Sequence, residues 1–380
     1  MRVLYLHPGY EKTGSTVIQD ALLLMRPTLQ AHGLDFPVLG AGPGLGLPQD
    51  LGQGMPQGPP EGLPVSGNAG LVFAHPARRR ALFEAASPRA RRGAIWSNEV
   101  LLLEHDARGR NLAELVDDAL ARGFDAVRIL LFVRDPVPHA ASLWQQYLRN
   151  ERRMDQPLDA WLADRYDHPR LVADFLEAAA ALPPETCRVE VHNHSRLAAP
   201  LLEIVRRWLD LPEAARPAQT DSVRANLSMT ASQARLLLAL NRQGAAGAMS
   251  SDLGLRLRAL DARGDPRKPA PSPAAVAAML ARIEPDLARA EALMPPAARY
   301  DRAALPAREA AEGDAARFLP PELGALAEEV GRLQLRLDAA ERDARRWRRL
   351  RACVPAPLRG AASAALHAAR SLRRRAARTP

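Results

Sequence analysis

The sequence predicts an α/β protein in which a parallel sheet is flanked by helices and followed by a C-terminal helical, coiled-coil extension. Short apolar runs, typical of buried strands, alternate with segments of helical periodicity, and this alternation favours a parallel sheet. The chain has 380 residues, of which 47% are hydrophobic, so it is long enough to bury a sizeable core. The expected strands are residues 2–6, 93–97, 127–133 and 187–192.

Helices are expected after these strands. A polar turn at residues 9–15 follows the first strand and leads into a helix at residues 16–24. The run VRILLFV at 127–133 is the strongest strand signal, and Pro136 ends it before a helix that runs from about Pro138 to Glu151. Further helices are expected at residues 112–122, 158–182 and 197–209.

Composition divides the chain into an α/β domain and a helical C-terminal part. The α/β domain is expected at residues 1–265, with a flexible insertion at 40–70 that holds ten glycines and six prolines. A polar-rich helical region is expected at residues 274–317, after a proline-rich linker. A coiled-coil helix at 319–350 and a basic tail at 351–380 complete the chain.

The coiled-coil prediction depends on a heptad pattern. Apolar residues recur in alternating steps of four and three over more than three heptads, which favours self-association, most simply as a homodimer. The alternative is one long helix folded back on the body. The heptad positions are Leu319, Leu323, Leu326, Val330, Leu333, Leu337, Ala340, Ala344 and Trp347.

The positive charge is concentrated at the C-terminal end. The net charge is +9, but residues 341–380 hold twelve arginines and two acidic residues, so they carry +10 and the rest carries about −1. The basic tail is therefore a solvated helix face, a site for an anionic membrane surface, or a site for polyanions. Nucleic acid is not expected as a partner, because Trp347 is the only aromatic residue there.

The rest of the sequence fits a reducing compartment. Two cysteines, Cys187 and Cys353, give neither a disulfide framework nor a metal-binding spacing. The N-terminus shows no signal-peptide pattern, and no uncharged apolar run approaches 18 residues. A cytoplasmic protein is expected, held by its basic tail at the inner face of the membrane if that tail binds lipid.

The turn after the first strand has the composition of a phosphate or sulfate cradle. Lys12 is one of only two lysines in an arginine-rich chain, which suggests that a compact ammonium group is required there. The lysine precedes the glycine, unlike in G-x-x-x-x-G-K-[ST], so the turn is P-loop-like without being a Walker A loop. A cation, hydroxyls and free helix N–H groups together bind anions. The cradle residues are Lys12, Thr13, Gly14, Ser15 and Thr16.

A second anion site is expected at the end of the 127–133 strand. Arg134 follows that strand, and Ser142 comes eight residues later on the next helix. Ligands of open α/β sheets bind beyond the carboxyl ends of strands, so these two side chains could hold a second phosphate. The alternative is a structural pair of Arg134 with Asp135 and a surface serine.

Together the two motifs resemble those of sulfotransferases that use 3′-phosphoadenosine 5′-phosphosulfate (PAPS). The matching patterns are H-x-G-x-x-K-T-G-[ST]-T and V-R-[DN]-P with a serine eight residues after the arginine. The resemblance covers roughly residues 1–245 and is closest to bacterial members that act on carbohydrate and cell-surface substrates. It extends more weakly to residues 95–99, 189–197 and 224–241.

The resemblance implies a role for each site residue, with PAPS as cosubstrate and no metal required. Lys12 would contact the bridging oxygen of the departing phosphate, while Arg134 and Ser142 would bind the 3′-phosphate. The 5′-phosphate would be bound by Thr13, Gly14, Ser15 and Thr16.

A general base is required to take the proton of the acceptor hydroxyl, and family members use a glutamate or a histidine. Glu99 is the first candidate because it follows a probable strand at the same sheet edge. His105 is the second and His7 the third. The acceptor is expected to be a carbohydrate or glycolipid, although sugar, lipid and peptide hydroxyls all remain open.

Two other functions are compatible with the sequence. A P-loop nucleotide kinase would need a magnesium-binding aspartate, for which only Asp135 is available; a non-catalytic, sulfotransferase-like assembly protein would use the coiled coil. Trp144 and Tyr147 are interpreted as packing residues at helical spacing. His192 and His194 form an H-x-H pair that is interpreted as part of a loop, because no carboxylate or cysteine partner is near in sequence.

Overall fold

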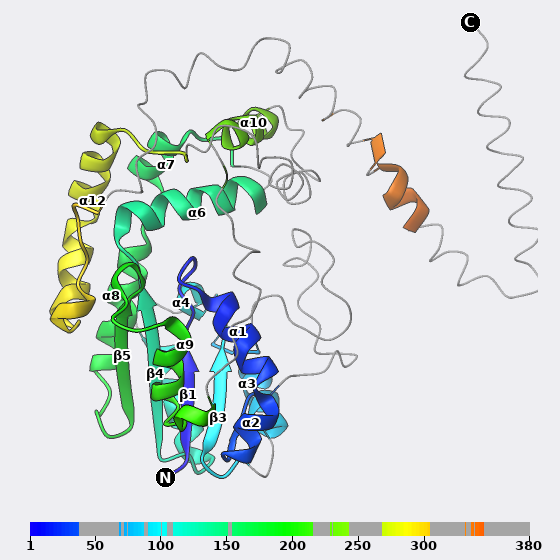
Figure 1. The fold of residues 1–380 in the computed structure, drawn as a ribbon, viewed down its shortest axis with the longest axis vertical. Coiled ribbons are helices and arrows are strands. Elements are labelled where there is room, and N and C mark those ends of the chain that lie inside the picture. Colours follow the sequence, from blue (N-terminus) through cyan, green and yellow to red (C-terminus); the bar gives the residue numbers. More distant parts are fainter. Residues whose placement is uncertain are drawn as a thin grey trace, which may run out of the picture.

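The computed structural model has a five-stranded, all-parallel sheet at its centre, which confirms the predicted α/β class (Figure 1). The strand order is β2-β3-β1-β4-β5. The strands are β1 (Val3–His7), β2 (Leu34–Asp35), β3 (Gly93–Ser97), β4 (Ala126–Val133) and β5 (Cys187–Asn193). The structure describes residues 1–37, 68–69, 72–73, 75–86, 90–99, 101–104, 109–150, 154–215, 229, 231–242, 268–304, 331, 336–337 and 339–345.

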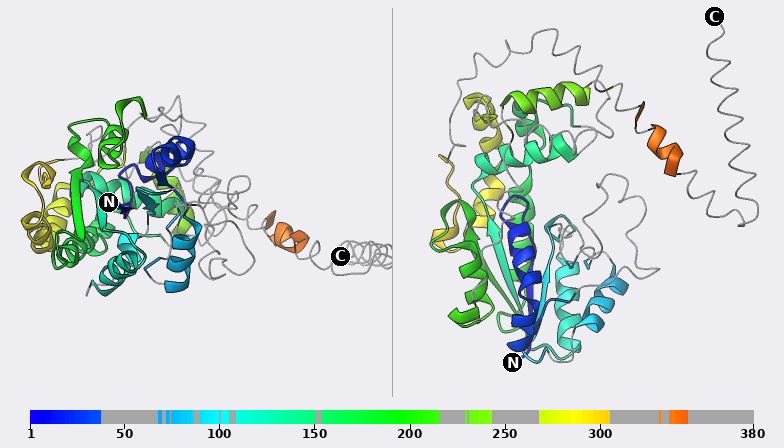
Figure 2. Two further views of the ribbon diagram at one scale, coloured as in Figure 1. Left: turned by 90° about the horizontal axis from the view of Figure 1, so that it is seen from below. Right: turned by 45° about the vertical axis from the view of Figure 1, so that its right-hand side comes forward.

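Helices cover both faces of the sheet, which explains the continuous apolar strand sequences (Figures 1 and 2). On β1, Val3 and Tyr5 belong to one hydrophobic cluster, and Leu4 and Leu6 belong to the other. The first cluster includes α1 (Ser15–Leu24), α2 (Arg26–Ala31) and α9 (Leu201–Trp208). The second includes α3 (Pro76–Ala85), α4 (Leu101–Glu104), α5 (Arg110–Ala121), α6 (Pro136–Asn150), α7 (Leu158–Asp164), α8 (His168–Ala180), α10 (Ala231–Arg242) and α12 (Pro273–Ala292).

Proline accounts for the main differences from the expected helices. The single helix expected at 158–182 is two helices, α7 and α8, and Pro169 lies in the first turn of α8. Proline lacks an amide N–H and clashes with the preceding turn, so it begins a helix more readily than it continues one. For the same reason α6 begins at Pro136, and α9 begins directly after Pro200.

The helix α12 shares the hydrophobic core of the sheet, although the sequence places residues 274–317 outside the 1–265 domain. It packs against α7 and α8. Its buried side chains include Met279, Ile283 and Leu287. The proline-rich linker therefore joins two parts of one packed body.

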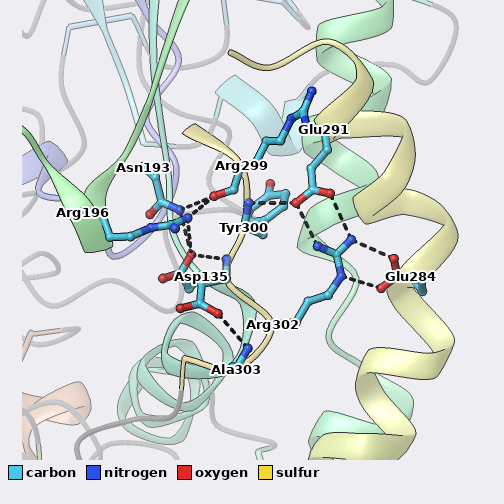
Figure 3. A network of polar contacts seen from close by, with 10 residues as sticks. Asp135, Asn193, Arg196, Glu284, Glu291, Arg299, Tyr300, Arg302 and Ala303 are labelled. Atoms are coloured by element: carbon cyan, nitrogen blue, oxygen red, sulfur yellow. Dashed lines mark hydrogen bonds and ion pairs between the residues drawn. The ribbon is translucent and has the colours of Figure 1, made fainter. Parts of the chain in front are cut away.

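The segment after α12 returns to the carboxyl ends of β4 and β5 (Figure 3). The N–H of Asp301 donates to Asp135 Oδ1 at 2.9 Å, and Asn193 Nδ2 donates to the carbonyl of Arg299 at 3.1 Å. Arg302 pairs with Glu284 and Glu291 of α12 and so fixes the end of this segment on the helix.

Several predictions fall outside the described residues. They concern the insertion at 40–70 apart from residues 68 and 69, the basic tail at 351–380, and Cys353. In the predicted coiled coil, residues 331, 336–337 and 339–345 are described, and they are helical. Among the described residues, no helix is both long and apolar enough to cross a membrane.

The shared core predicts that α12 unfolds together with the sheet. Ile283→Ala is expected to lower the free energy of unfolding by about 2–4 kcal/mol, because Ile283 is 1% exposed and its truncation leaves a cavity. Chemical denaturation followed by far-UV circular dichroism measures this. Leu293→Ala, at a 40% exposed position after the same helix, is the control and should cost little. A sheet that unfolds as in the wild type in Ile283→Ala would show that α12 is not part of the cooperative core.

Candidate functional site

The strand order predicts where a ligand binds. The chain leaves β1 toward β2 on one side, and it leaves β4, the neighbour of β1, toward β5 on the other side. Connections that diverge from two adjacent parallel strands leave a crevice beyond their carboxyl ends, and ligands of open α/β sheets bind there. The loop that holds Lys12 follows β1, and Arg134 follows β4, so both predicted motifs lie at this edge of the sheet.

A direct hydrogen bond joins the two motifs. Arg134 Nη1 donates to the carbonyl of Lys12 at 3.2 Å. The Arg134 side chain is half-buried, and this burial is the main reason that its pKa is lower than usual. Arginine nevertheless keeps its charge at any pH at which the protein is folded, so a fixed cation lies beside the loop.

The loop adopts a conformation that depends on glycine. Gly14 has φ 87° and immediately precedes α1. A Cβ atom at Gly14 would lie 2.6 Å from Cδ2 of Leu201, closer than carbon atoms can approach. A Cβ atom at Gly9 would lie 2.8 Å from the carbonyl oxygen of Asn98. These two glycines let the loop fit between α9 and the end of β3.

The hydroxyls of the loop face different neighbours. Thr13 and Ser15 are buried, and both donate to the carbonyl of Tyr10. Their hydroxyls therefore stabilise the loop. An anion at the N-terminus of α1 would be bound by their backbone N–H groups instead. Thr16 Oγ1 instead donates to Glu99 Oε1 at 3.0 Å.

Glu99 lies beside the loop, at the sheet edge where the sequence places it. The neighbouring N–H of Asn98 donates to the carbonyl of His7, which holds the end of β3 against the end of β1. Burial is the main factor that raises the pKa of Glu99, and the negative charge of Glu11 adds to it. The hydrogen bond from Thr16 and the charge of Lys12 act in the opposite direction.

A buried network around Glu11 holds the other side of the loop, and sequence reasoning missed it. The Glu11 carboxylate accepts hydrogen bonds from Gln146 Nε2 at 2.7 Å, Tyr147 Oη at 3.1 Å and His168 Nε2 at 3.1 Å. The carbonyl of Glu11 accepts from His139 Nε2 at 2.8 Å. Tyr147, interpreted from sequence as a packing residue, is thus a hydrogen-bond donor to the loop, whereas Trp144 is buried in the core.

The position of Ser142 follows from this network. His139 and Gln146 flank it at i−3 and i+4 on α6, and both contact Glu11. Residues at these spacings share one face of a helix, so Ser142 lies on the face of α6 that meets the loop. The polar stripe formed by His139, Ser142 and Gln146 is the signal that could have revealed the network from sequence.

Of the two other base candidates, the structure describes His7. His105 lies outside the described residues. His7 is fully buried, with Nδ1 2.8 Å from Ser97 Oγ, and burial lowers its pKa to about 4. His7 therefore connects β1 to β3 within the core.

Asp135 does not use its carboxylate to bind Arg134. Its Oδ1 accepts hydrogen bonds from Asn193 Nδ2 at 2.7 Å and from the N–H of Asp301, and Arg196 lies 3.6 Å from it (Figure 3). Asp135 is 2% exposed. It therefore acts as a structural junction between β4, β5 and the segment after α12.

No cluster of metal-ligating side chains occurs in the part of the chain that the structure describes. No protein-family model, curated protein or solved structure matches this chain significantly. Function therefore has to be inferred from the arrangement of the residues themselves.

The loop geometry predicts that a side chain at Gly14 destabilises the protein, because the backbone there is left-handed and Leu201 must shift to make room. Gly14→Ala is expected to destabilise the protein by more than the roughly 1–2 kcal/mol that a left-handed backbone costs an L-residue, because the methyl group also collides with Leu201. Gly123→Ala is a matched control, since Gly123 has φ 76° and its Cβ would meet nothing within 4 Å. Thermal unfolding of both variants checks this, and equal losses would contradict the close packing at Gly14.

Proposed function

We propose that this protein is a sulfotransferase that moves a sulfuryl group from PAPS to a hydroxyl of a carbohydrate or glycolipid acceptor. The observation that carries the proposal is the 3.2 Å hydrogen bond from Arg134 to the carbonyl of Lys12, because it makes two separate anion-binding motifs neighbours. A nucleotide with phosphate groups at both the 5′ and the 3′ positions needs two such cradles side by side. The P-loop-like character of the first cradle is part of the same proposal.

Different residues would bind the two phosphate groups of the nucleotide. The N-terminus of α1 and the backbone of residues 13–16 would hold the 5′-phosphate, since free N–H groups and the helix dipole favour an anion there. Arg134 and Ser142 would hold the 3′-phosphate from the β4–α6 side. Lys12 would contact the oxygen that bridges the 5′-phosphate and the sulfuryl group, at the bond that breaks.

In the proposed reaction the acceptor oxygen attacks sulfur in line with the bond to the phosphate oxygen. That sulfur–oxygen bond breaks, and its electron pair stays on the departing phosphate, where the ammonium of Lys12 stabilises the new negative charge. The acceptor proton passes to a general base. The products are a sulfate ester and adenosine 3′,5′-bisphosphate.

Glu99 is the proposed base. Its carboxylate bonds to Thr16, a residue of the 5′-phosphate cradle, so it lies close to where the sulfuryl group would be transferred. Its raised pKa makes it a stronger proton acceptor than an exposed glutamate.

The kinase alternative has less support. A kinase of this type needs a strand-end carboxylate to bind magnesium, and Asp135 is buried with its carboxylate held by Asn193, Asp301 and Arg196. Dimerisation through residues 319–350 and membrane attachment through residues 341–380 remain proposals for the C-terminal part.

The proposal predicts binding of adenosine 3′,5′-bisphosphate without magnesium. Calorimetry should show that Lys12→Ala and Arg134→Ala each weaken binding by roughly 10- to 100-fold, the range expected for charge-assisted hydrogen bonds. Arg128→Ala is the control, because Arg128 lies on β4, the strand before Arg134, and pairs with Asp210. Binding of ATP with magnesium, and of no bisphosphate, would favour the kinase; binding of neither would favour the assembly protein.

The role of Glu99 predicts a pH dependence. A base must be ionised, so turnover should fall as the pH drops through the pKa of Glu99, and this fall should begin at a higher pH than for an ordinary glutamate. Transfer of labelled sulfate from PAPS to glycan extracts, measured against pH, checks this. Glu99→Gln should keep bisphosphate binding and lose most turnover. Full turnover in that variant would leave His105 as the candidate.

A further inference from the structure

The two histidines of the H-x-H pair at the end of β5 have different environments. Nε2 of His192 lies 2.6 Å from Glu190 Oε1, so His192 pairs with its own strand. The strand ends at Asn193, and a short 3-10 helix, His194–Arg196, redirects the chain. His194 consequently leaves the strand and comes to the loop between β1 and α1.

His194 lies against Gly14, the residue directly before α1. A Cβ atom on Gly14 would lie 3.4 Å from Nε2 of His194 and 3.8 Å from its Cδ2. The imidazole is therefore in van der Waals range of the α1 N-terminus, where helix N–H groups attract an anion. Within the described part of the chain, the imidazole of His194 forms no hydrogen bond, so its N–H is not committed to another group.

The backbone on both sides of His194 is fixed to the Arg134 end of the site. The N–H of Asp135 donates to Ser195 Oγ at 3.2 Å, and Asn193 Nδ2 donates to Asp135 Oδ1 at 2.7 Å (Figure 3 shows Asn193 and Asp135). Asn193 Oδ1 in turn accepts from the N–H of Ser195 at 2.9 Å. These bonds hold His194 in place before any ligand arrives, which lowers the entropic cost of binding.

We propose that His194 is a further binding residue of the phosphate site, which donates a hydrogen bond from its imidazole to the anion at the N-terminus of α1. This inference rests on the proposed function in so far as it places a phosphate or sulfate group at the first turn of that helix. With His194, the residues that follow β5 contribute to the site together with those that follow β1, β3 and β4.

The electrostatic surroundings of His194 agree with this role. Burial, and next the positive charge of Arg134, lower the pKa of His194 to about 4. The groups around it are Arg134, the positive end of α1 at Gly14 and the apolar Leu201. An anion bound between them reverses the local field, so it raises the pKa of the imidazole.

Inorganic pyrophosphate is the probe. It carries phosphate groups without a nucleoside, so its binding tests the proposed anion site at the N-terminus of α1 alone. Calorimetry should show that His194→Ala weakens pyrophosphate binding at least tenfold, whereas His194→Gln, which keeps a donor near the same place, recovers most of it. His192→Ala is the matched control and should bind as the wild type does. Wild-type affinity in His194→Ala, or no binding of pyrophosphate by the wild type, would overturn the proposal.

Imidazole NMR of the wild-type protein gives a second readout that does not depend on a variant. Saturating pyrophosphate should raise the pKa of His194 from its starting value of about 4 and leave His192 unchanged. An unchanged His194 resonance across the titration would contradict a direct contact.

Comparison of adenosine 5′-monophosphate with adenosine 3′,5′-bisphosphate separates this inference from the proposed function. The gain in affinity that the 3′-phosphate gives tests Arg134 and Ser142. The loss of affinity in His194→Ala tests the site of the 5′-phosphate. Loss in His194→Ala without a gain from the 3′-phosphate would support His194 and reject PAPS. The reverse result would reject His194 alone.

Discussion

Two consecutive backbone carbonyls, those of Glu11 and Lys12, are held from the β4 side, and the rest of the site depends on this. His139 donates to the first and Arg134 to the second. In a planar trans peptide the N–H points opposite to the C=O, so these bonds also fix the direction of the next N–H groups. Lys12 has φ 62°, which costs about 1–2 kcal/mol and persists only where its surroundings enforce it. The bonds from β4 and α6 provide that enforcement.

The carboxylate of Glu11 affects both the position of the loop and the pKa of the proposed base, Glu99. Burial of an ionised carboxylate is unfavourable unless hydrogen bonds replace its water, and three side chains from α6 and α8 do so here. The same charge contributes to the raised pKa of Glu99 on the other side of the loop. One buried carboxylate therefore anchors the loop and also adds to the basicity of the proposed base.

Four of the strands, and the meeting of Lys12, Glu99 and Arg134 at one sheet edge, could be predicted from sequence, because both depend on local patterns. Apolar runs identified β1, β3, β4 and β5, and the polar residues after them necessarily meet at one sheet edge. The network around Glu11 could not be predicted, since its partner His168 is 157 residues away and α8 was expected to be continuous with α7. The position of His194 depends on how Asn193 and Asp135 fold the turn after β5, which periodicity does not encode.

The return of the chain to Asp135 after α12 determines where the C-terminal residues begin. Asp301 is bonded to the neighbour of Arg134, and the stretch described there ends at residue 304. A chain spans at most about 3.5 Å per residue, so residue 304 lies within roughly 15 Å of Asp135, the neighbour of Arg134. The segment after α12 and the strand end that carries Arg134 therefore share one anchor, the Asp135 carboxylate, so loss of that carboxylate would disturb both.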